Sequence, residues 1–210
     1  RNMIALNSYS TPKEGITAEV VYIDDLQKLS TMDVKGKIVF AETSPYQIFK
    51  AAIVDGKAAG IITYDNPAYL QPEKNTTSIQ FRSIPLDSVN KPWAIALSYQ
   101  AKERLKRALE YEKVALKVMV ETNIYPSEEL TIIADIKGNK NPKERLVFSA
   151  HIQEPGANDN ATGVGVALEM ATLTAKFSKQ KEYQPKRTLT FLWGDEIIST
   201  RRYVQEDSLR

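Results

Sequence analysis

Hydrophobic and polar positions alternate along the first 125 residues with the periods of strands and helices. Apolar or strictly alternating runs predict strands, and these runs lie at 16–23, 34–40, 60–64, 78–84, 93–97 and 114–120. A helix should begin at Pro45, and a second should follow the candidate N-cap Ser98 and end near 112. Residues 1–15 are polar and rich in turn formers, so an irregular lead-in is expected there. The pattern therefore predicts a β-rich unit with two helices.

A composition shift separates this unit from the rest of the chain. The polar stretch 122–129 is typical of a linker, which predicts domains at 1–125 and 126–210. Strands are expected at 130–136, 146–150 and 188–193, with a turn at 137–143, a helix at 162–177 and a short helix after Ser199. Alternation of strands and helices is typical of an α/β fold.

Composition narrows the classes of function. The 210 residues carry a net charge of only +2 and no dense basic block, which argues against nucleic acid as a partner. No window is apolar enough for a membrane span. The chain has no cysteine, so disulfides, thiolate metal sites and a cysteine nucleophile are excluded. A processed exported protein would lack an initial methionine and a signal peptide as this sequence does, and export is the expectation.

Candidate chemistry gathers after the strand ends of the second domain. His151, the one histidine, ends a strand, and Asp159 follows it across a turn that contains Gly156. The next strand runs into two adjacent acids, Asp195 and Glu196. Strand ends of an open α/β sheet meet at one edge, where a histidine and carboxylates can bind a divalent metal. One acid of the pair could bind the metal while the other accepts a proton from a water on it.

Each of these features has a simpler interpretation. A histidine at a strand end is more often a polar surface residue, an Asp-Asn pair before a helix is more often a cap, and an acidic pair is often only solvated. Their joint appearance at successive strand ends favours the metal site. A serine hydrolase is disfavoured because Gly-x-Ser-x-Gly is absent, and a P-loop is absent as well.

Two motifs carry a resemblance to a known family. The segment from His151 to Gly163, HIQEPGANDNATG, followed by RTLTFLWGDE at 187–196, resembles the M28 zinc aminopeptidases. The first domain is similar to a protease-associated (PA) domain, through VKGKIVF at 34–40 and AAGIITY at 58–64. The resemblance implies a mixed, mainly parallel sheet flanked by helices, as in zinc exopeptidases. It also implies hydrolysis of N-terminal residues from peptide substrates.

The resemblance also implies roles for residues. His151 would bind one zinc and Asp159 would bridge two, with Glu196 as a further ligand and Asp195 as general base. Gln153 and Asn160 would help to orient these ligands without binding the metal themselves. The sequence departs from the family pattern at Gln153, where many members have an aspartate that orients the histidine.

The largest departure is the number of ligands. The family needs a further acid and a second histidine, and no second histidine occurs in this chain. We therefore expect the chain to be an N-terminal portion of a longer peptidase, with two zinc ions only in the full-length form and apolar surface exposed between 146 and 193. The alternative is a catalytically silent binding module that keeps the architecture for peptides or protein partners. The preferred substrate residue and the oligomeric state do not follow from the sequence.

Overall fold

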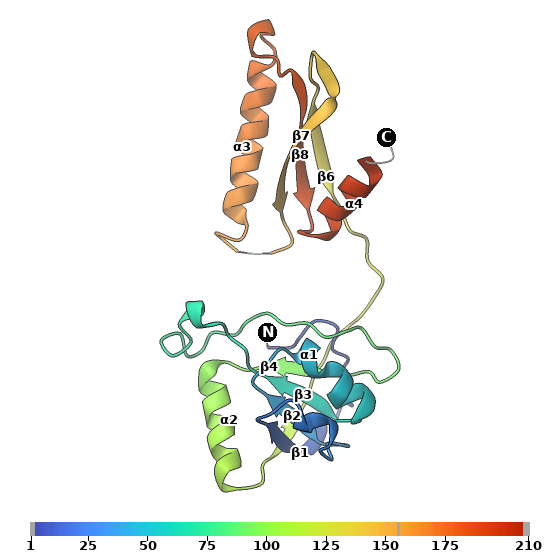
Figure 1. Cartoon of the computed structure of the whole chain (residues 1–210), viewed down its shortest axis with the longest axis vertical. Helices are drawn as coiled ribbons and strands as arrows, with labels where there is room; N and C mark the ends of the chain where they lie inside the picture. The colour runs from blue at the N-terminus through green and yellow to red at the C-terminus, as the bar shows by residue number, and fades with distance from the viewer. Residues whose placement is uncertain (1–2, 155, 208–210) are drawn as a thin grey trace. The chain divides into compact units, whose positions relative to one another are not determined.

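The computed structural model describes residues 3–154 and 156–207, and it divides into two compact units. The first spans Arg1–Tyr125 and the second Pro126–Arg210 (Figure 1). In the part of the chain that the structure describes, no helix combines the length and apolar character that crossing a membrane requires.

The first unit is built on a five-stranded sheet with the order β4-β3-β2-β1-β5. Neighbours among β1 to β4 are parallel, and β5 runs antiparallel beside β1. The strands are β1 (Ile16–Ile23), β2 (Ile38–Ala41), β3 (Gly60–Thr63), β4 (Ala94–Ala96) and β5 (Ala115–Val118). Every residue of β2 and β3 is buried, as expected for parallel strands that are covered on both faces.

Helices cover both faces of this sheet (Figure 1). On one side α1 (Pro45–Phe49) continues as a π-helical segment, Lys50–Asp55, and this side packs on Val39 and Ile61. On the other side α2 (Tyr99–Tyr111) packs through apolar side chains on a second cluster. That cluster contains Ile38, Phe40, Ile62, Leu105 and Leu109. Alternate residues of β2 and β3 thus belong to opposite cores, which follows from the two-residue period of a strand. Single 3₁₀ turns lie at Lys28–Ser30 and Ala68–Leu70.

A buried lysine ties α2 to the sheet. The Lys102 side chain is only 8% exposed, and its Nζ lies 3.3 Å from Oε2 of Glu42 and also pairs with Glu103. The same ammonium lies 4.9 Å and 4.7 Å from the ring centroids of Tyr64 and Tyr99. Two carboxylates and two aromatic faces therefore replace the water that this charge loses.

Glu42, which follows β2, is the anionic centre of the same cluster. Its Oε1 accepts hydrogen bonds from Tyr22 Oη and Lys106 Nζ, each at 2.7 Å. Burial by itself raises the pKa of Glu42, but these hydrogen bonds and the Lys102 charge outweigh it and hold the pKa below its ordinary value. The cluster is therefore stabilised when Glu42 is ionised.

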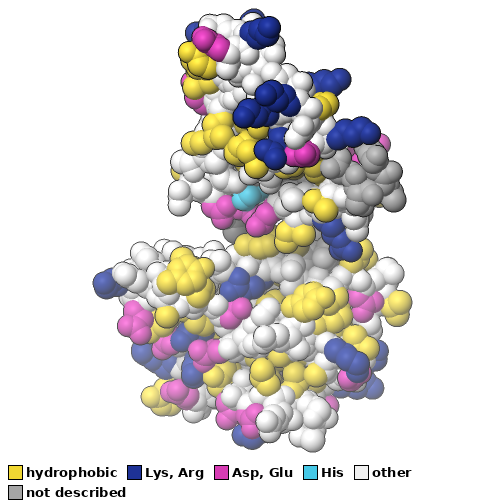
Figure 2. Space-filling model, turned by 45° about the horizontal axis from the view of Figure 1, so that its top comes forward, with side chains coloured by type: hydrophobic (Ala, Val, Ile, Leu, Met, Phe, Trp, Pro, Cys, Tyr) yellow, Lys and Arg dark blue, Asp and Glu magenta, His cyan; other side chains and the backbone are white. Residues whose placement is uncertain are grey.

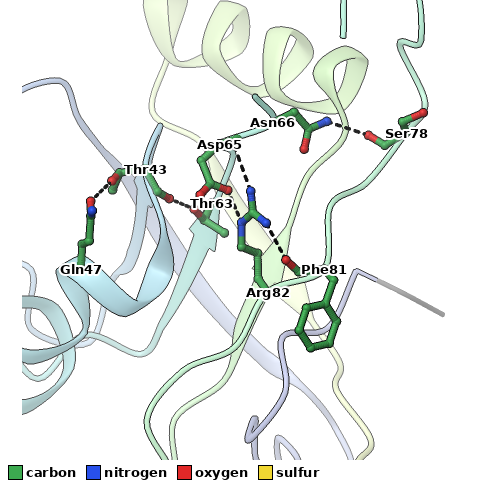
Figure 3. A network of polar contacts seen from close by, with 8 residues as sticks. All are labelled: Thr43, Gln47, Thr63, Asp65, Asn66, Ser78, Phe81 and Arg82. Atoms are coloured by element: carbon green, nitrogen blue, oxygen red, sulfur yellow. Dashed lines mark hydrogen bonds and ion pairs between the residues drawn. The ribbon is translucent and has the colours of Figure 1, made fainter. Parts of the chain in front are cut away.

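The long segment between β3 and β4 is held by polar contacts instead of a strand (Figure 3). Arg82 forms an ion pair with Asp65, and its Nη2 donates to the Asp65 carbonyl at 2.9 Å. Asn66 donates to the carbonyl of Ser78 at 3.0 Å. The strand predicted at 78–84 is wrong, because this segment forms only an isolated bridge between Ser83 and Leu6. Backbone hydrogen bonds join this segment to the lead-in, from the Leu6 amide to the Arg82 carbonyl and from the Ile84 amide to the Leu6 carbonyl.

The second unit has a three-stranded sheet with the order β6-β8-β7. The central strand β8 is parallel to β7 and antiparallel to β6, so the sheet is mixed. The elements are β6 (Ile132–Ile136), β7 (Asn141–His151), α3 (Ala161–Phe177), a 3₁₀ turn (Lys181–Tyr183), β8 (Arg187–Gly194) and α4 (Ile198–Asp207). The turn predicted up to 143 is shorter, since β7 begins at Asn141 and passes an irregularity before Arg145.

Side chains of α3 and one face of the sheet form the core of this unit. Phe191 and Trp193 are 1% and 7% exposed, and they stack with ring centroids 6.0 Å apart. Most of α3 is nonetheless exposed, including Val166 at 60% and Leu168 at 57%. Leu146 on β7 is 52% exposed. The exposed apolar surface predicted for 146–193 is therefore present in the unit as described.

Candidate metal site

The register between β7 and β8 brings the predicted site residues to one edge of the sheet. His151 and Gly194 are paired Cα partners at the ends of two parallel strands, and the amide of Ile152 donates to the Gly194 carbonyl at 3.0 Å. His151 therefore leaves the sheet beside the point where the chain turns into Asp195. This is the neighbourhood of strand ends that the sequence pattern predicts.

The loop after β7 folds back on itself before α3 begins. The amide of Ala161 donates to the carbonyl of Gly156 at 3.0 Å, and the amide of Thr162 to that of Ala157 at 3.0 Å. A Cβ at Gly156 would lie 1.8 Å from the carbonyl oxygen of Asp159, so the turn requires glycine at this position. The tight turn carries Asp159 back toward the strand end from which the loop departed.

The turn places a carboxylate against the histidine. Oδ1 of Asp159 lies 3.0 Å from Nε2 of His151. The His151 side chain is 14% exposed, whereas that of Asp159 is 77% exposed. Glu154 joins them, because one ligand atom of each of the three residues lies within 4.8 Å of the others. In Figure 2 the histidine, in cyan, lies beside acidic side chains in magenta.

Glu154 is the site residue that the sequence analysis missed. It stands three positions after His151, and the intervening turn brings both side chains to the same side. The signal that could have indicated it is its position in the sequence, since an acid inside a short loop that runs between two candidate ligands, His151 and Asp159, stays close to both.

Gln153 and Asn160, the two residues predicted to orient the metal ligands, make few side-chain contacts. Nδ1 of His151 is buried and has no hydrogen-bond partner within the described ranges 3–154 and 156–207. Gln153, which is exposed, therefore does not bond to it. Asn160 is the N-cap residue of α3 without a side-chain cap bond, and its amide group lies over Gly163, where a Cβ would meet Oδ1 at 2.1 Å.

The acidic pair that follows β8, Asp195 and Glu196, makes different contacts from those of the acids in the loop 151–159. Oδ1 of Asp195 accepts from the amides of Ile198 at 3.0 Å and Ile197 at 3.3 Å, and therefore caps α4. Glu196 is exposed. Among the described residues, the group of three potential ligands contains neither acid of the pair. The roles of ligand for Glu196 and base for Asp195 remain predictions.

Comparison with known proteins gives the class to which this architecture is related. Residues 131–196 match the family model described as Peptidase family M28. The aminopeptidase from Aneurinibacillus sp. strain AM-1 superposes with a TM-score of 0.62 at 25% identity, over 93% of this chain and 48% of that one. The chain is therefore a relative of the M28 peptidases, and the predicted resemblance to that family and the α/β fold are confirmed. The PA-like character of the first domain and the truncation stay predictions.

Individual relatives carry both aminopeptidase and carboxypeptidase names. Aminopeptidase YwaD of Bacillus subtilis is 30% identical over 186 residues, which cover 85% of this chain and 38% of the relative. Human carboxypeptidase Q is 26% identical over 211 residues, covering 90% and 42%. A probable zinc metalloprotease of Pyrenophora tritici-repentis is 32% identical over 80 residues, covering 32% and 17%. The chain thus spans less than half the length of each of these relatives.

Proposed function

We propose that this chain belongs to a zinc-dependent peptidase that removes N-terminal residues from peptides. The observation that carries the proposal is the 3.0 Å contact between His151 Nε2 and Asp159 Oδ1, in a segment that matches the M28 peptidases. Support for zinc comes from the donors themselves, since imidazole nitrogen and carboxylate oxygen are typical zinc ligands.

The spacing of the two donors fits a shared ion. Zinc–nitrogen and zinc–oxygen bonds of about 2.1 Å with tetrahedral angles place two ligand atoms roughly 3.4 Å apart. The observed 3.0 Å is close to this separation, so a small rotation of the exposed Asp159 side chain is enough. His151 needs no such adjustment, because its largely buried ring is fixed at the strand end.

In this proposal each residue of the site has a separate role. His151 and Asp159 would hold the metal, and Glu196 would add a ligand. When bound, zinc acts as a Lewis acid and lowers the pKa of water toward neutrality. Asp195 would serve as the base that accepts a proton from water, and its Oδ2 is the atom suited to this, since its Oδ1 is engaged by the amides of Ile197 and Ile198. In the full-length enzyme we propose two zinc ions, with His151 and Asp159 among the residues that would hold them.

Further parts of the proposal concern the rest of the molecule. We propose that the first unit is a PA-like accessory domain that helps to admit or dock substrate, and that the protein is exported. Cell fractionation tests the second statement. Recovery of the protein only from the cytoplasm would contradict it.

A catalytically silent binding module is the second candidate, and one observation favours it. Nδ1 of His151 has no partner in the described part of the chain, and Gln153 supplies no charge to orient the ring. Metal ligands usually have such support, and its loss typically weakens metal binding or activity by about 10- to 100-fold.

Protected peptides test the activity and its direction in the protein purified from its native source. We expect a free peptide to be cleaved, and chelation to abolish cleavage until zinc is restored. N-acetylation should block cleavage and C-terminal amidation should not, because an aminopeptidase needs the free amine. Blockage by amidation alone would contradict the aminopeptidase assignment. Zinc-bound protein without hydrolysis of any peptide would favour the silent module.

A further inference from the structure

The loop 151–159 contains more donors than the proposed peptidase site uses. His151, Glu154 and Asp159 come from one segment of nine residues, and a ligand atom from each lies within 4.8 Å of the other two. Both ends of this segment are anchored, one in β7 and the other before α3. Because its ends are fixed, closing the segment around an ion costs less conformational entropy than ordering a free loop would.

We propose that Glu154 is a direct metal ligand, so that this loop alone holds one zinc ion with three protein donors. The inference rests on the proposed metal site at His151 and Asp159, and extends it to a residue outside the expected ligand set. It places a complete primary ion site within this chain, independent of any ligand supplied from elsewhere.

Coordination chemistry supports three donors over two. Hydrolytic zinc sites characteristically have three protein ligands and keep one position open. Within this loop, His151 and Asp159 leave such a site one ligand short, and Glu196, the third ligand of the proposed peptidase site, is outside the group of donors that the described residues bring together. Glu154 supplies the missing donor from the same turn, and the separation of up to 4.8 Å is within reach of its flexible, exposed side chain.

Charge balance supports the same assignment. A neutral imidazole with the carboxylates of Glu154 and Asp159 carries a charge of about −2, which neutralises a divalent cation. The neighbouring Gln153 brings no charge. Without Glu154, the loop would supply only the Asp159 carboxylate and leave the ion with net positive charge beside the N-terminus of α3, whose dipole is itself unfavourable for a cation.

Zinc binding by the 210-residue chain tests the inference without any need for activity. Competition with a chromophoric chelator, in 0.5 M salt to screen exposed charges, gives affinity and stoichiometry. We expect one zinc per chain, with affinity at least about tenfold weaker in Glu154→Gln. Glu169→Gln removes an exposed carboxylate from α3 in the same unit and should bind as the unmodified chain does.

Cobalt replaces zinc to show whether Glu154 touches the ion. Visible absorption of bound Co²⁺ depends on the number and type of ligands, so Glu154→Gln should change the band, whereas Glu169→Gln should not. Weaker binding with an unchanged band would overturn direct ligation in favour of through-space attraction.

The outcomes separate this inference from the proposed function. If Glu154→Gln binds like the unmodified chain while His151→Ala and Asp159→Asn abolish binding, the third ligand is refuted and the peptidase site stands. If the chain binds no zinc, the self-contained site is refuted, and the chelation assay on the native protein decides the function separately. One zinc per chain, lost in Glu154→Gln with a changed cobalt band, supports the inference.

Discussion

A methyl group at Gly156 should disturb the candidate site more than its size suggests. In Gly156→Ala the new Cβ would lie 1.8 Å from the carbonyl oxygen and 2.8 Å from the carbonyl carbon of Asp159. Both are backbone atoms, so no side-chain rotation relieves the clash. Gly165 is the matched control, because it lies a few residues further along in α3 and a Cβ there meets nothing within 4 Å.

The expected magnitude follows from the contact distances. Since Cβ atoms essentially never approach closer than 3.0 Å, the Asp159 carbonyl must retreat by at least the 1.2 Å that separates this limit from 1.8 Å. Misplacement of a functional group by about 1 Å can cost about 10²-fold, so we expect zinc affinity to fall by about 10- to 100-fold. Strain in the turn should lower the free energy of unfolding by about 1–3 kcal/mol.

Chelator competition and urea unfolding followed by circular dichroism measure the two effects. Gly165→Ala should leave zinc affinity unchanged and stabilise the second unit by about 0.8–1 kcal/mol, because alanine is the better helix former. If Gly156→Ala matched the unmodified chain in both assays, the close approach of residues 156 and 159 would be refuted, and with it the route by which Asp159 reaches His151.

Three further predictions concern stability. Glu42→Gln should cost about 1–2 kcal/mol at pH 7. Because the pKa of Glu42 is depressed, this contribution is present above the ordinary carboxyl pKa of about 4 and is lost as pH falls through the lower folded value. Urea titrations should therefore show a smaller difference in unfolding free energy between Glu42→Gln and the unmodified chain at pH 3 than at pH 7. An equal difference at both pH values would contradict the ion-pair origin. Phe191→Ala should cost about 3–5 kcal/mol by leaving a cavity against Trp193, with Phe191→Leu clearly milder; equal costs would argue against close packing there. Ser98→Ala removes the 3.3 Å cap bond to the Ala101 amide and should cost about 1 kcal/mol, which Ser98→Asp should largely restore; if it does not, the cap is not the cause.

The sequence predicts elements well where local and tertiary preferences agree. The alternation at 16–23 coincides with β1, and the helix expected at 162–177 appears as α3 with one added residue. Ser98 caps α2 as predicted, because its oxygen accepts from Ala101. In each case the local pattern and the tertiary contacts favour the same element.

Disagreements arise where a distant partner decides. The residues 141–145 contain Pro142 and three charged side chains, which is typical of a turn, yet β8 recruits them into an irregular edge of β7. Segment 78–84 has the alternation of a strand, but its one strand-like pairing is the isolated bridge to Leu6 in the lead-in. The local sequence pattern shows neither the pairing of 141–145 with β8 nor the limited pairing of 78–84 near Leu6.

The candidate site was predictable in outline. His151 and Asp159 are brought together as expected, because a strand that ends at His151 and a turn at Gly156 can both be recognised in the local sequence. The proximity of Glu154 depends on the exact path of that turn. The engagement of Asp195 by the amides of α4 depends on where that helix begins, which sequence patterns place only within a few residues.

The enclosure of Lys102 gives that side chain an unusual chemical reactivity. Burial alone lowers the pKa of Lys102, but the partners Glu103 and Glu42 outweigh it and the pKa is raised, so the unprotonated amine is scarce as well as sheltered. Amine-directed acylating reagents should therefore modify Lys102 far more slowly than the exposed lysines around it. Its labelling rate consequently measures how often α2 lifts from the sheet, and mass spectrometry can follow that local opening without perturbing the second unit.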